Sequence, residues 1–256
     1  MNILDEIIIR KKKEVAVRKK STPLFKLKSS GADEYDFLSA LRKKPMGFIA
    51  EIKRKSPSAG VIRSPFDLQA VARSYADHGA TAISCLIDEF YFGGGEKDFK
   101  LVREVVNLPM LYKEFVIDEW QISHAKFLGA SAVLLIVSAL DKYELSNLMD
   151  CINEHNLTAL VEVHNQKEMD QALEIGAECI GINNRNLKTF QVSLDVTINL
   201  LENYSEDIVV VSESGIKSSD DVYKLKEAGV DALLVGERLL ANSDPGLAIQ
   251  HLLCKI

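Results

Sequence analysis

The sequence is poor in several features that define special classes of protein. Only 14 glycines and 6 prolines occur in 256 residues, and no segment has a biased composition, which excludes collagen-like, mucin-like and disordered chains. No apolar run approaches the 18 or more residues of a membrane span. Asp5 and Glu6 stand where a secretory signal peptide has its basic start and apolar stretch. We therefore expect a soluble, cytoplasmic protein that does not bind membranes.

Cysteine is also scarce. The four cysteines are far apart, and none belongs to a CxxC pair, which argues against a disulfide framework and against a structural zinc site. Cys85 and Cys179 lie within apolar runs. We expect both to be small core residues without a chemical role.

The net charge of −6 hides a basic N-terminal segment. Residues 1–44 contain 12 of the 31 Lys and Arg residues but only 6 of the 37 Asp and Glu residues. Nucleic-acid binding is therefore a hypothesis to weigh, but no aromatic residues accompany the basic run and the rest of the chain is acidic. Positions 3, 4, 7, 8, 11 and 15 follow a helical period. This spacing predicts an amphipathic helix with its lysines in solvent, and no nucleic-acid partner.

From residue 47 onward, short β-rich runs alternate with longer amphipathic segments. The apolar runs are continuous rather than alternating, which is typical of parallel strands covered on both faces. The predicted strands are Gly47–Arg54, Thr81–Asp88, Pro109–Phe115, Ala132–Val137, Thr158–Val163, Cys179–Asn184, Asp207–Glu213 and Ala232–Glu237. The predicted helices include Asp67–His78, Glu119–Leu128, Lys142–His155, Gln166–Ile175 and Ser218–Ala228.

Glycine follows four of these helical segments, at Gly79, Gly129, Gly176 and Gly229, where it can close a helix in the left-handed conformation. Eight regular strand–helix units predict a (β/α)8 TIM barrel, an α/β fold, over residues 47–256. Residues 1–46 are then an N-terminal helical extension that caps the rim, and the whole chain is one domain. An open doubly wound sheet is the alternative, but no GxGxxG motif follows the first strand.

The predicted strands end in unusually polar residues. Because active sites of such barrels lie at the carboxyl ends of the strands, these side chains share one mouth. They are Glu51, Lys53, Lys113, Glu162, His164, Asn183, Arg185, Glu213 and Ser214. Alternation along the first strand points Glu51 and Lys53 inward together. Rim salt bridges would explain any single charge, but clustered acids and bases favour a catalytic site. For His164 we expect a hydrogen bond to the backbone.

A metal site is an alternative interpretation of the same mouth. Glu51, Asp88, Glu162 and Glu213 could provide oxygen ligands for a divalent cation. Two lysines in the mouth already balance these carboxylates, and no histidine has metal-ligand spacing, so we expect no metal.

Small-residue turns follow the last two strands, at residues 212–216 and 235–237. Barrels of this kind often bind phosphate at these two loops through backbone N–H groups and a helix N-terminus. The pair of loops predicts a phosphorylated small-molecule ligand.

Five strand-end motifs together resemble the indole-3-glycerol phosphate synthase family. They are Ile49–Ser58, Leu111–Asp118, Leu160–His164, Ile180–Leu187 and Ser212–Ile216. The resemblance covers nearly the whole chain, from the N-terminal extension to the eighth strand. It implies the substrate 1-(2-carboxyphenylamino)-1-deoxyribulose 5-phosphate, ring closure with loss of carbon dioxide and water, a place in tryptophan biosynthesis and no cofactor. We expect a monomer, with other enzymes of the pathway as candidate partners.

The resemblance also implies a role for each polar residue. Lys113 resembles the general acid, with Glu51 holding its ammonium group, while Glu162 and Lys53 are candidates for the second acid and the base. The implied binding residues are Asn183, Glu213 and Ser214 for the hydroxyls and the anthranilate end, Arg185 and Ser56 for the anthranilate carboxylate, and Lys53, Gly215, Gly236 and Glu237 for the phosphate.

The chain departs from the family pattern at two places. Arg238 stands where Ser or Ala is common, and the loop Glu89–Gly95 contains three glycines that predict greater mobility. Two other hypotheses remain open. The first is a Schiff-base aldolase, which would use Lys113 or Lys53 as a neutral nucleophile. The second is a non-catalytic phosphate sensor, which would keep the two phosphate-binding loops but lack acid or base residues.

Overall fold

The computed structural model describes residues 3–27, 35–43, 45–56, 60–62, 67–186, 189–202 and 207–256. Pro57, Ser58 and Leu187, which belong to the motifs quoted above, lie outside these ranges.

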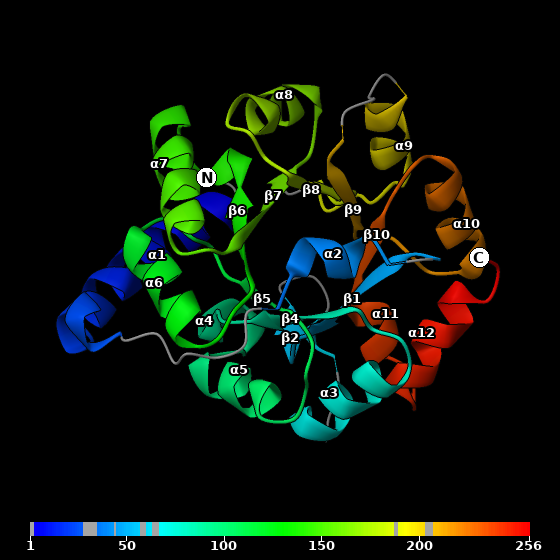
Figure 1. Ribbon diagram of the computed structural model, residues 1–256, viewed down its shortest axis with the longest axis horizontal. Coiled ribbons are helices and arrows are strands. Elements are labelled where there is room, and N and C mark those ends of the chain that lie inside the picture. Colours follow the sequence, from blue (N-terminus) through cyan, green and yellow to red (C-terminus); the bar gives the residue numbers. More distant parts are fainter. Residues whose placement is uncertain are drawn as a thin grey trace.

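Eight parallel strands close into a barrel, with helices around it (Figure 1). The order around the barrel is β1-β10-β9-β8-β7-β6-β5-β4. The strands are β1 (Gly47–Ile52), β4 (Ala82–Leu86), β5 (Met110–Lys113), β6 (Ala132–Ile136), β7 (Thr158–Val163), β8 (Cys179–Asn183), β9 (Val209–Glu213) and β10 (Ala232–Val235). The predicted (β/α)8 TIM barrel with an N-terminal helix is confirmed. Several predicted strands were one or two residues too long, so Lys53 and Arg54 follow β1 rather than belonging to it.

The helices of the outer layer begin at side chains that cap them. Asp, Asn or Ser residues at positions 67, 88, 118, 141, 165, 218 and 244 each accept a hydrogen bond from a backbone N–H in the first helical turn. These helices are α3 (Leu68–Asp77), α4 (Glu89–Phe92), α6 (Glu119–Phe127), α7 (Lys142–Glu154), α8 (Gln166–Glu174), α10 (Ser219–Glu227) and α12 (Pro245–Leu253). The remaining helical segments are α5 (Glu96–Arg103), η2 (Val137–Ala139), α9 (Asp195–Leu201) and α11 (Glu237–Leu240). Gly79, Gly129, Gly176 and Gly229 have φ between 75° and 103°, which confirms their predicted place after helices.

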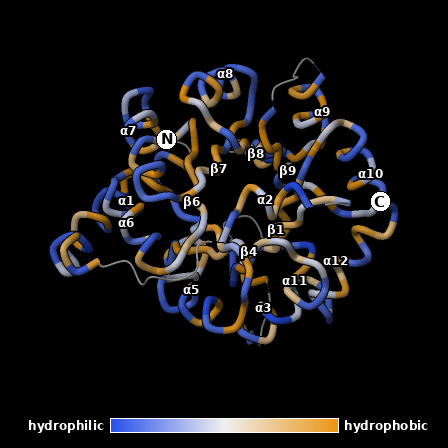
Figure 2. Tube along the Cα trace, viewed as in Figure 1, coloured by the Kyte–Doolittle hydropathy of each residue, from blue (hydrophilic) through white to orange (hydrophobic). Residues whose placement is uncertain are grey.

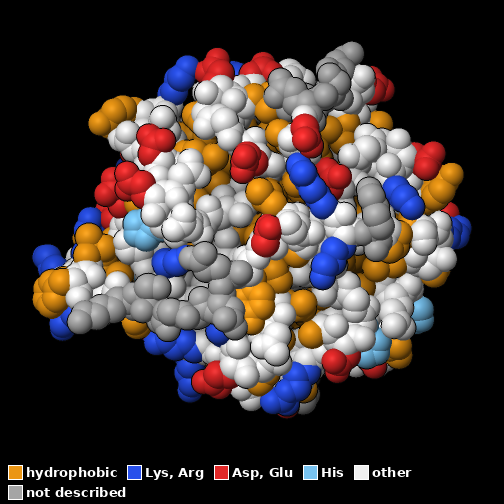
Figure 3. Space-filling model, in the orientation of Figure 1, with side chains coloured by type: hydrophobic (Ala, Val, Ile, Leu, Met, Phe, Trp, Pro, Cys, Tyr) orange, Lys and Arg blue, Asp and Glu red, His pale blue; other side chains and the backbone are white. Residues whose placement is uncertain are grey.

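Apolar side chains fill both the interior of the barrel and the layer between strands and helices. Hydrophobic residues gather along the strands and on the inner sides of the helices in Figure 2. Cys85 and Cys179 are buried, as expected for core residues. In the part of the chain described here, no helix has the length and apolar character needed to cross a membrane. Acidic and basic side chains are interspersed over the face shown in Figure 3.

One part of the N-terminal extension closes the floor of the barrel. Helix α2 (Phe37–Leu41) lies across the central opening of the ring in Figure 1. Phe37 and Leu41 join the buried cluster formed by inward residues at the start of the strands. The chain then enters β1 so closely that a Cβ atom on Gly47 would lie 2.3 Å from the carbonyl oxygen of Leu41. Glycine is therefore required at this position.

The other part of the extension lies at the opposite end, by the mouth. Helix α1 (Ile3–Ser21) packs beside α6 and is followed by the short segment η1 (Leu24–Lys26). The prediction that its lysines face solvent is wrong for Lys11, whose side chain is 4% exposed. Lys11 Nζ lies 2.8 Å from Asp88 Oδ2 and 3.0 Å from Glu114 Oε1. These carboxylates compensate for the burial of the ammonium group and tie α1 to the ends of β4 and β5.

Two loops at the mouth have a defined structure. After β1, the strands β2 (Lys55–Ser56) and β3 (Gly60–Val61) form a small antiparallel hairpin. The glycine-rich loop after β4 begins with α4, which Asp88 caps and which ends at Gly93. A Cβ atom on Gly94 would lie 2.0 Å from the Leu86 carbonyl oxygen. Gly94 therefore permits a close approach between this loop and the end of β4.

Candidate active site

A cavity of about 790 Å³ opens at the carboxyl ends of the strands. One part of its wall is apolar and includes Ile3, Leu4 and Ile7 of α1, together with Phe92 and Phe115. The residues that the family resemblance implies as catalytic or binding all line the cavity, whereas His164, expected in the same mouth, does not. They are Glu51, Lys53, Ser56, Lys113, Glu162, Asn183, Arg185, Glu213, Ser214, Gly215, Gly236 and Glu237.

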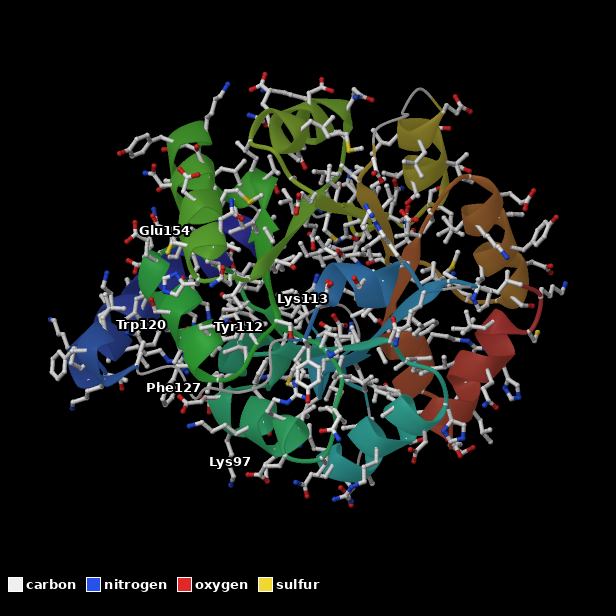
Figure 4. The ribbon with its side chains drawn as sticks, in the orientation of Figure 1. Lys97, Tyr112, Lys113, Trp120, Phe127 and Glu154 are labelled. Carbon is white, nitrogen blue, oxygen red and sulfur yellow. The ribbon has the colours of Figure 1, made fainter. Side chains whose placement is uncertain are left out.

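Lys113 lies inside the ring of strands, at the end of β5 (Figure 4). Its Nζ atom is 2.7 Å from Glu213 Oε2 and 3.2 Å from Glu162 Oε2. Burial disfavours the ammonium form, but the two carboxylates outweigh it and raise the pKa of Lys113. The lysine is consequently charged and can donate a proton. The preceding residue, Tyr112, points outward, where its hydroxyl group lies 3.1 Å from His124 Nδ1.

Glu51 and Lys53 form a second ion pair in the mouth. Lys53 Nζ lies 2.6 Å from Glu51 Oε1. Both side chains face the cavity, as strand alternation predicted. Glu51 contacts Lys53 and not the Lys113 ammonium group, which lies between Glu213 and Glu162, but its charge also raises the pKa of Lys113. Gly236 leaves the space for Glu51, since a Cβ atom there would lie 2.6 Å from Glu51 Oε1.

Glu162 accepts hydrogen bonds from Lys113 and Asn183 and lies beside the ring of His164. Besides Lys113, the amide of Asn183 donates to its Oε1 atom at 3.1 Å, and His164 Nε2 lies 3.4 Å from the same oxygen. Although burial opposes ionisation, Lys113 and His164 lower the pKa of Glu162. The prediction that His164 bonds the backbone is wrong, because its ring lies between Glu162 and Glu168. The signal in the sequence was the two-residue spacing from Glu162.

Glu213 is the second carboxylate on Lys113. It is buried, and burial together with the neighbouring Glu162 charge raises its pKa to about 7 against the effect of Lys113. Sequence reasoning missed Gly181, on the adjacent strand β8. A Cβ atom there would lie 2.3 Å from Glu213 Oε1, so glycine makes room for this carboxylate. A glycine inside a strand is the signal that could have indicated this close approach.

The loop after β9 has an unusual backbone. Ser214 and Gly215 both have left-handed conformations, with φ of 65° and 84°. At Gly215 a Cβ atom would lie 2.6 Å from Val192 Cγ1, so a side chain is excluded as well. Asn184, another residue that sequence reasoning did not single out, donates to the carbonyl oxygens of Glu213 and Ser214 at 3.0 and 3.1 Å. This buried amide fixes the turn.

The loop after β10 lies beside the loop after β9. Gly236 precedes α11, whose first N–H groups have no acceptor within the helix. Arg238 is exposed, but it does not simply extend into solvent. Its Nε–H donates to the Lys217 carbonyl oxygen at 3.1 Å and so links the two loops.

The carboxylates of the suggested metal site do not form one group. Asp88 contacts Lys11, whereas Glu51, Glu162 and Glu213 contact the two lysines of the mouth. Within the described ranges, no three or more His, Cys, Asp or Glu side chains are arranged as metal ligands.

Comparison with known proteins gives two kinds of similarity. The fold is similar to 3-hexulose-6-phosphate synthase from Salmonella typhimurium, with a TM-score of 0.65 and 14% identity over 82% of this chain and 99% of that one. It is also similar to N-acetylmannosamine-6-phosphate 2-epimerase from Clostridium perfringens, with a TM-score of 0.64 and 16% identity over 90% and 100% of the two chains. At these identities the similarity concerns the fold alone.

Sequence similarity is more specific. The chain is 42% identical over 259 residues to indole-3-glycerol phosphate synthase of Laribacter hongkongensis, covering 98% of both chains. It is 43% identical over 257 residues to the protein of the same name from Burkholderia vietnamiensis, again covering 98% of both. The family model for indole-3-glycerol phosphate synthase matches residues 4–252. The chain therefore belongs to the indole-3-glycerol phosphate synthase family of carboxy-lyases.

Proposed function

We propose that the protein converts 1-(2-carboxyphenylamino)-1-deoxyribulose 5-phosphate into indole-3-glycerol phosphate by lysine and glutamate acid–base catalysis, without a cofactor. The observation that carries this proposal is the buried Lys113, held between two carboxylates at the floor of a cavity with an apolar wall. Family membership supports the choice of substrate.

The first step forms a carbon–carbon bond. The aromatic carbon that bears the carboxylate attacks the ribulose carbonyl carbon, and the carbonyl electrons move onto oxygen. Lys113 donates a proton to this developing alkoxide, and the negative surroundings of its ammonium group keep that proton in place before the reaction. Loss of carbon dioxide then returns its bonding electrons to the ring.

The second step removes water. The new hydroxyl group leaves with a proton from an acid, while a base removes a proton from the neighbouring carbon. We assign the acid to Lys53 and the base to Glu162. Glu162 is available as the base because Lys113 and His164 lower its pKa and keep it ionised, although the same contacts weaken its affinity for a proton. Glu51 holds the Lys53 ammonium group in position.

The two ends of the substrate require different surroundings. We assign the anthranilate carboxylate to Arg185 and Ser56, because a guanidinium group forms a two-pronged hydrogen bond with a carboxylate. The phosphate is assigned to Lys53 and to the N–H groups of Gly215, Gly236 and Glu237. The substrate hydroxyls and the anthranilate end are assigned to Asn183, Glu213 and Ser214.

The test is formation of a fluorescent indole product from this substrate by the purified protein. A parallel sample treated with borohydride separates the reaction from a Schiff-base mechanism. We expect indole formation and no trapped adduct, because a charged Lys113 is a poor nucleophile. Absence of indole product contradicts the proposal, and a trapped lysine adduct favours the aldolase alternative.

We further propose that residues 1–256 form one monomeric domain, with residues 1–46 as the extension and 47–256 as the barrel, and that the protein acts in the cytoplasm on a small-molecule substrate without nucleic acid or membrane. Placement of Lys11 against Asp88 and Glu114 supports an intramolecular role for part of the basic segment. Binding to DNA at physiological salt, or a dimer in solution, contradicts this.

Removal of residues 1–21 is expected to raise KM at least about tenfold, because the cavity loses the apolar wall of Ile3, Leu4 and Ile7. The barrel should still fold, since α2 remains on its floor. Removal of residues 1–44 should in addition lower thermal stability, because Phe37 and Leu41 are lost from the core. Steady-state kinetics and thermal unfolding check both expectations. An unchanged KM after removal of residues 1–21 contradicts the role of α1.

Arg238→Ala is expected to raise KM less than about fivefold and to leave kcat unchanged, because the backbone N–H groups provide the phosphate site. Gly236→Asp should nearly abolish binding. Its side chain would collide with Glu51 and add a negative charge beside the phosphate. A loss of more than about tenfold for Arg238→Ala that weakens with added salt would instead identify a direct ion pair with the phosphate.

A further inference from the structure

His164 is a half-buried ionisable side chain with no role in the proposed mechanism. It follows the last residue of β7, and its side chain is 12% exposed. Both nitrogens of its ring face carboxylates. Nδ1 lies 3.0 Å from Glu168 Oε2, and Nε2 is buried and lies 3.4 Å from Glu162 Oε1.

The Glu168 carboxylate is itself fixed. Its Oε2 atom accepts the backbone N–H of His164 at 2.8 Å, and its Oε1 atom accepts the side-chain amide of Asn165 at 2.7 Å. Glu168 also sits in the first turn of α8, where a negative charge is favourable. It is therefore an ionised acceptor, and Nδ1 of His164 carries the proton between them.

This assignment determines the state of the other nitrogen. A neutral ring with its proton on Nδ1 would present the Nε2 lone pair to the Glu162 carboxylate, which is repulsive. A proton on both nitrogens turns both contacts into attractions. We propose that His164 is a positioning residue, held as an imidazolium between Glu168 and Glu162, which keeps the Glu162 carboxylate in place and ionised. The proposal deepens the proposed function and rests on it for the role of Glu162 as the base.

Other charges also face Glu162. Lys113 on β5 donates to it, Glu213 on β9 shares that lysine, and Glu51 on β1 lies in the same mouth. Burial opposes charge on His164, but the contacts with Glu162 and Glu168 raise its pKa to about 10. His164 is thus a second cation beside Glu162, on the side away from Lys113.

The direct test is the protonation state of the ring in the full-length, ligand-free protein. Nitrogen-15 NMR of the histidine side chains, with the His164 signal identified by its absence in His164→Gln, should show both ring nitrogens protonated at pH 8. Glu168→Gln should shift the titration of His164 to lower pH. A His164 ring that loses a proton below pH 7 in the wild-type protein overturns the proposal.

The kinetic test separates positioning from a merely structural role. In His164→Gln, the acidic limb of kcat/KM should move upward by about 1 to 3 pH units, because Glu162 loses a nearby positive charge. At pH 7, kcat should fall by about 10- to 100-fold while KM changes little, since the base is displaced. His164→Lys, which keeps the charge, should move the limb less. His251→Gln on the exposed face of α12 is the matched control.

An unchanged acidic limb in His164→Gln overturns the inference even when the wild-type protein turns over. Failure of the wild-type protein to form indole overturns the proposed function instead. In that case the NMR titration still decides whether His164 is held as an imidazolium.

Discussion

Lys113→Met is expected to reduce kcat by about 10³-fold or more, at the upper end of what one acid–base group contributes. Its proton is needed only when charge develops on the carbonyl oxygen. Binding of a substrate analogue should therefore stay within about tenfold of the wild-type value. Steady-state indole formation and equilibrium binding measure the two effects separately.

A loss of activity in Lys113→Met must be distinguished from a loss of folding stability. Removal of Lys113 leaves Glu162 and Glu213 buried without their shared cation, a loss of about 3–5 kcal/mol when one partner of a buried pair is removed. Circular dichroism and thermal unfolding establish that the variant is folded. Lys142→Met removes an exposed lysine that is paired with Glu174, and it should keep full activity. A Lys113→Met variant that retains more than about a tenth of wild-type kcat removes Lys113 from the general-acid role.

Glu162→Gln is expected to reduce kcat by about 10²–10⁴-fold, with a smaller change in KM. Glutamine has nearly the same shape and keeps an oxygen for Asn183, but it cannot accept a proton as a carboxylate does. It also leaves Lys113 without one of its two carboxylate acceptors. Single-turnover kinetics should show the loss in the chemical step rather than in product release.

The matched control for this substitution is Glu174→Gln, on the exposed side of α8, which should leave kcat unchanged. Retention of kcat within about threefold by Glu162→Gln contradicts a role for this carboxylate in proton transfer. The base would then have to be another group of the mouth.

The barrel itself could be predicted because its signals are local. Continuous apolar runs, capping residues and the closing glycines each depend on a few neighbouring positions, and all agree on the same units. Boundaries were less accurate at the strand ends. The first strand was predicted to run to Arg54, but its hydrogen-bonded ladder ends at Ile52, and the polar residues Lys53 and Arg54 follow it.

The set of cavity residues was also predictable, because alternation along a strand decides which side chains point inward. Their pairing was not. Glu51 and Glu213 are equally suitable partners for Lys113 by sequence, and only closure of the barrel brings β9 opposite β5 and leaves Glu51 with Lys53. Which carboxylate meets which lysine is a property of the three-dimensional arrangement.

Two errors have a common cause. Lys11 was predicted to face solvent with the other lysines of its helix, although it stands on the apolar period, and His164 was predicted to bond the backbone because it stands alone after a strand. Their partners are remote or lie on another element. Asp88 and Glu114 are 77 and 103 residues away from Lys11, and Glu168 belongs to the helix after His164. A buried charge can be foreseen only when its compensating charges are known.

We propose that ring closure depends on proton transfer by lysine and glutamate, with no metal ion. The most direct measurement is the rate of indole formation by wild-type protein after prolonged chelation and removal of the chelator. We expect an undiminished rate that added magnesium or zinc does not increase. Loss of activity on chelation that magnesium or zinc restores would contradict it and would assign Glu51, Glu162 and Glu213 to a metal.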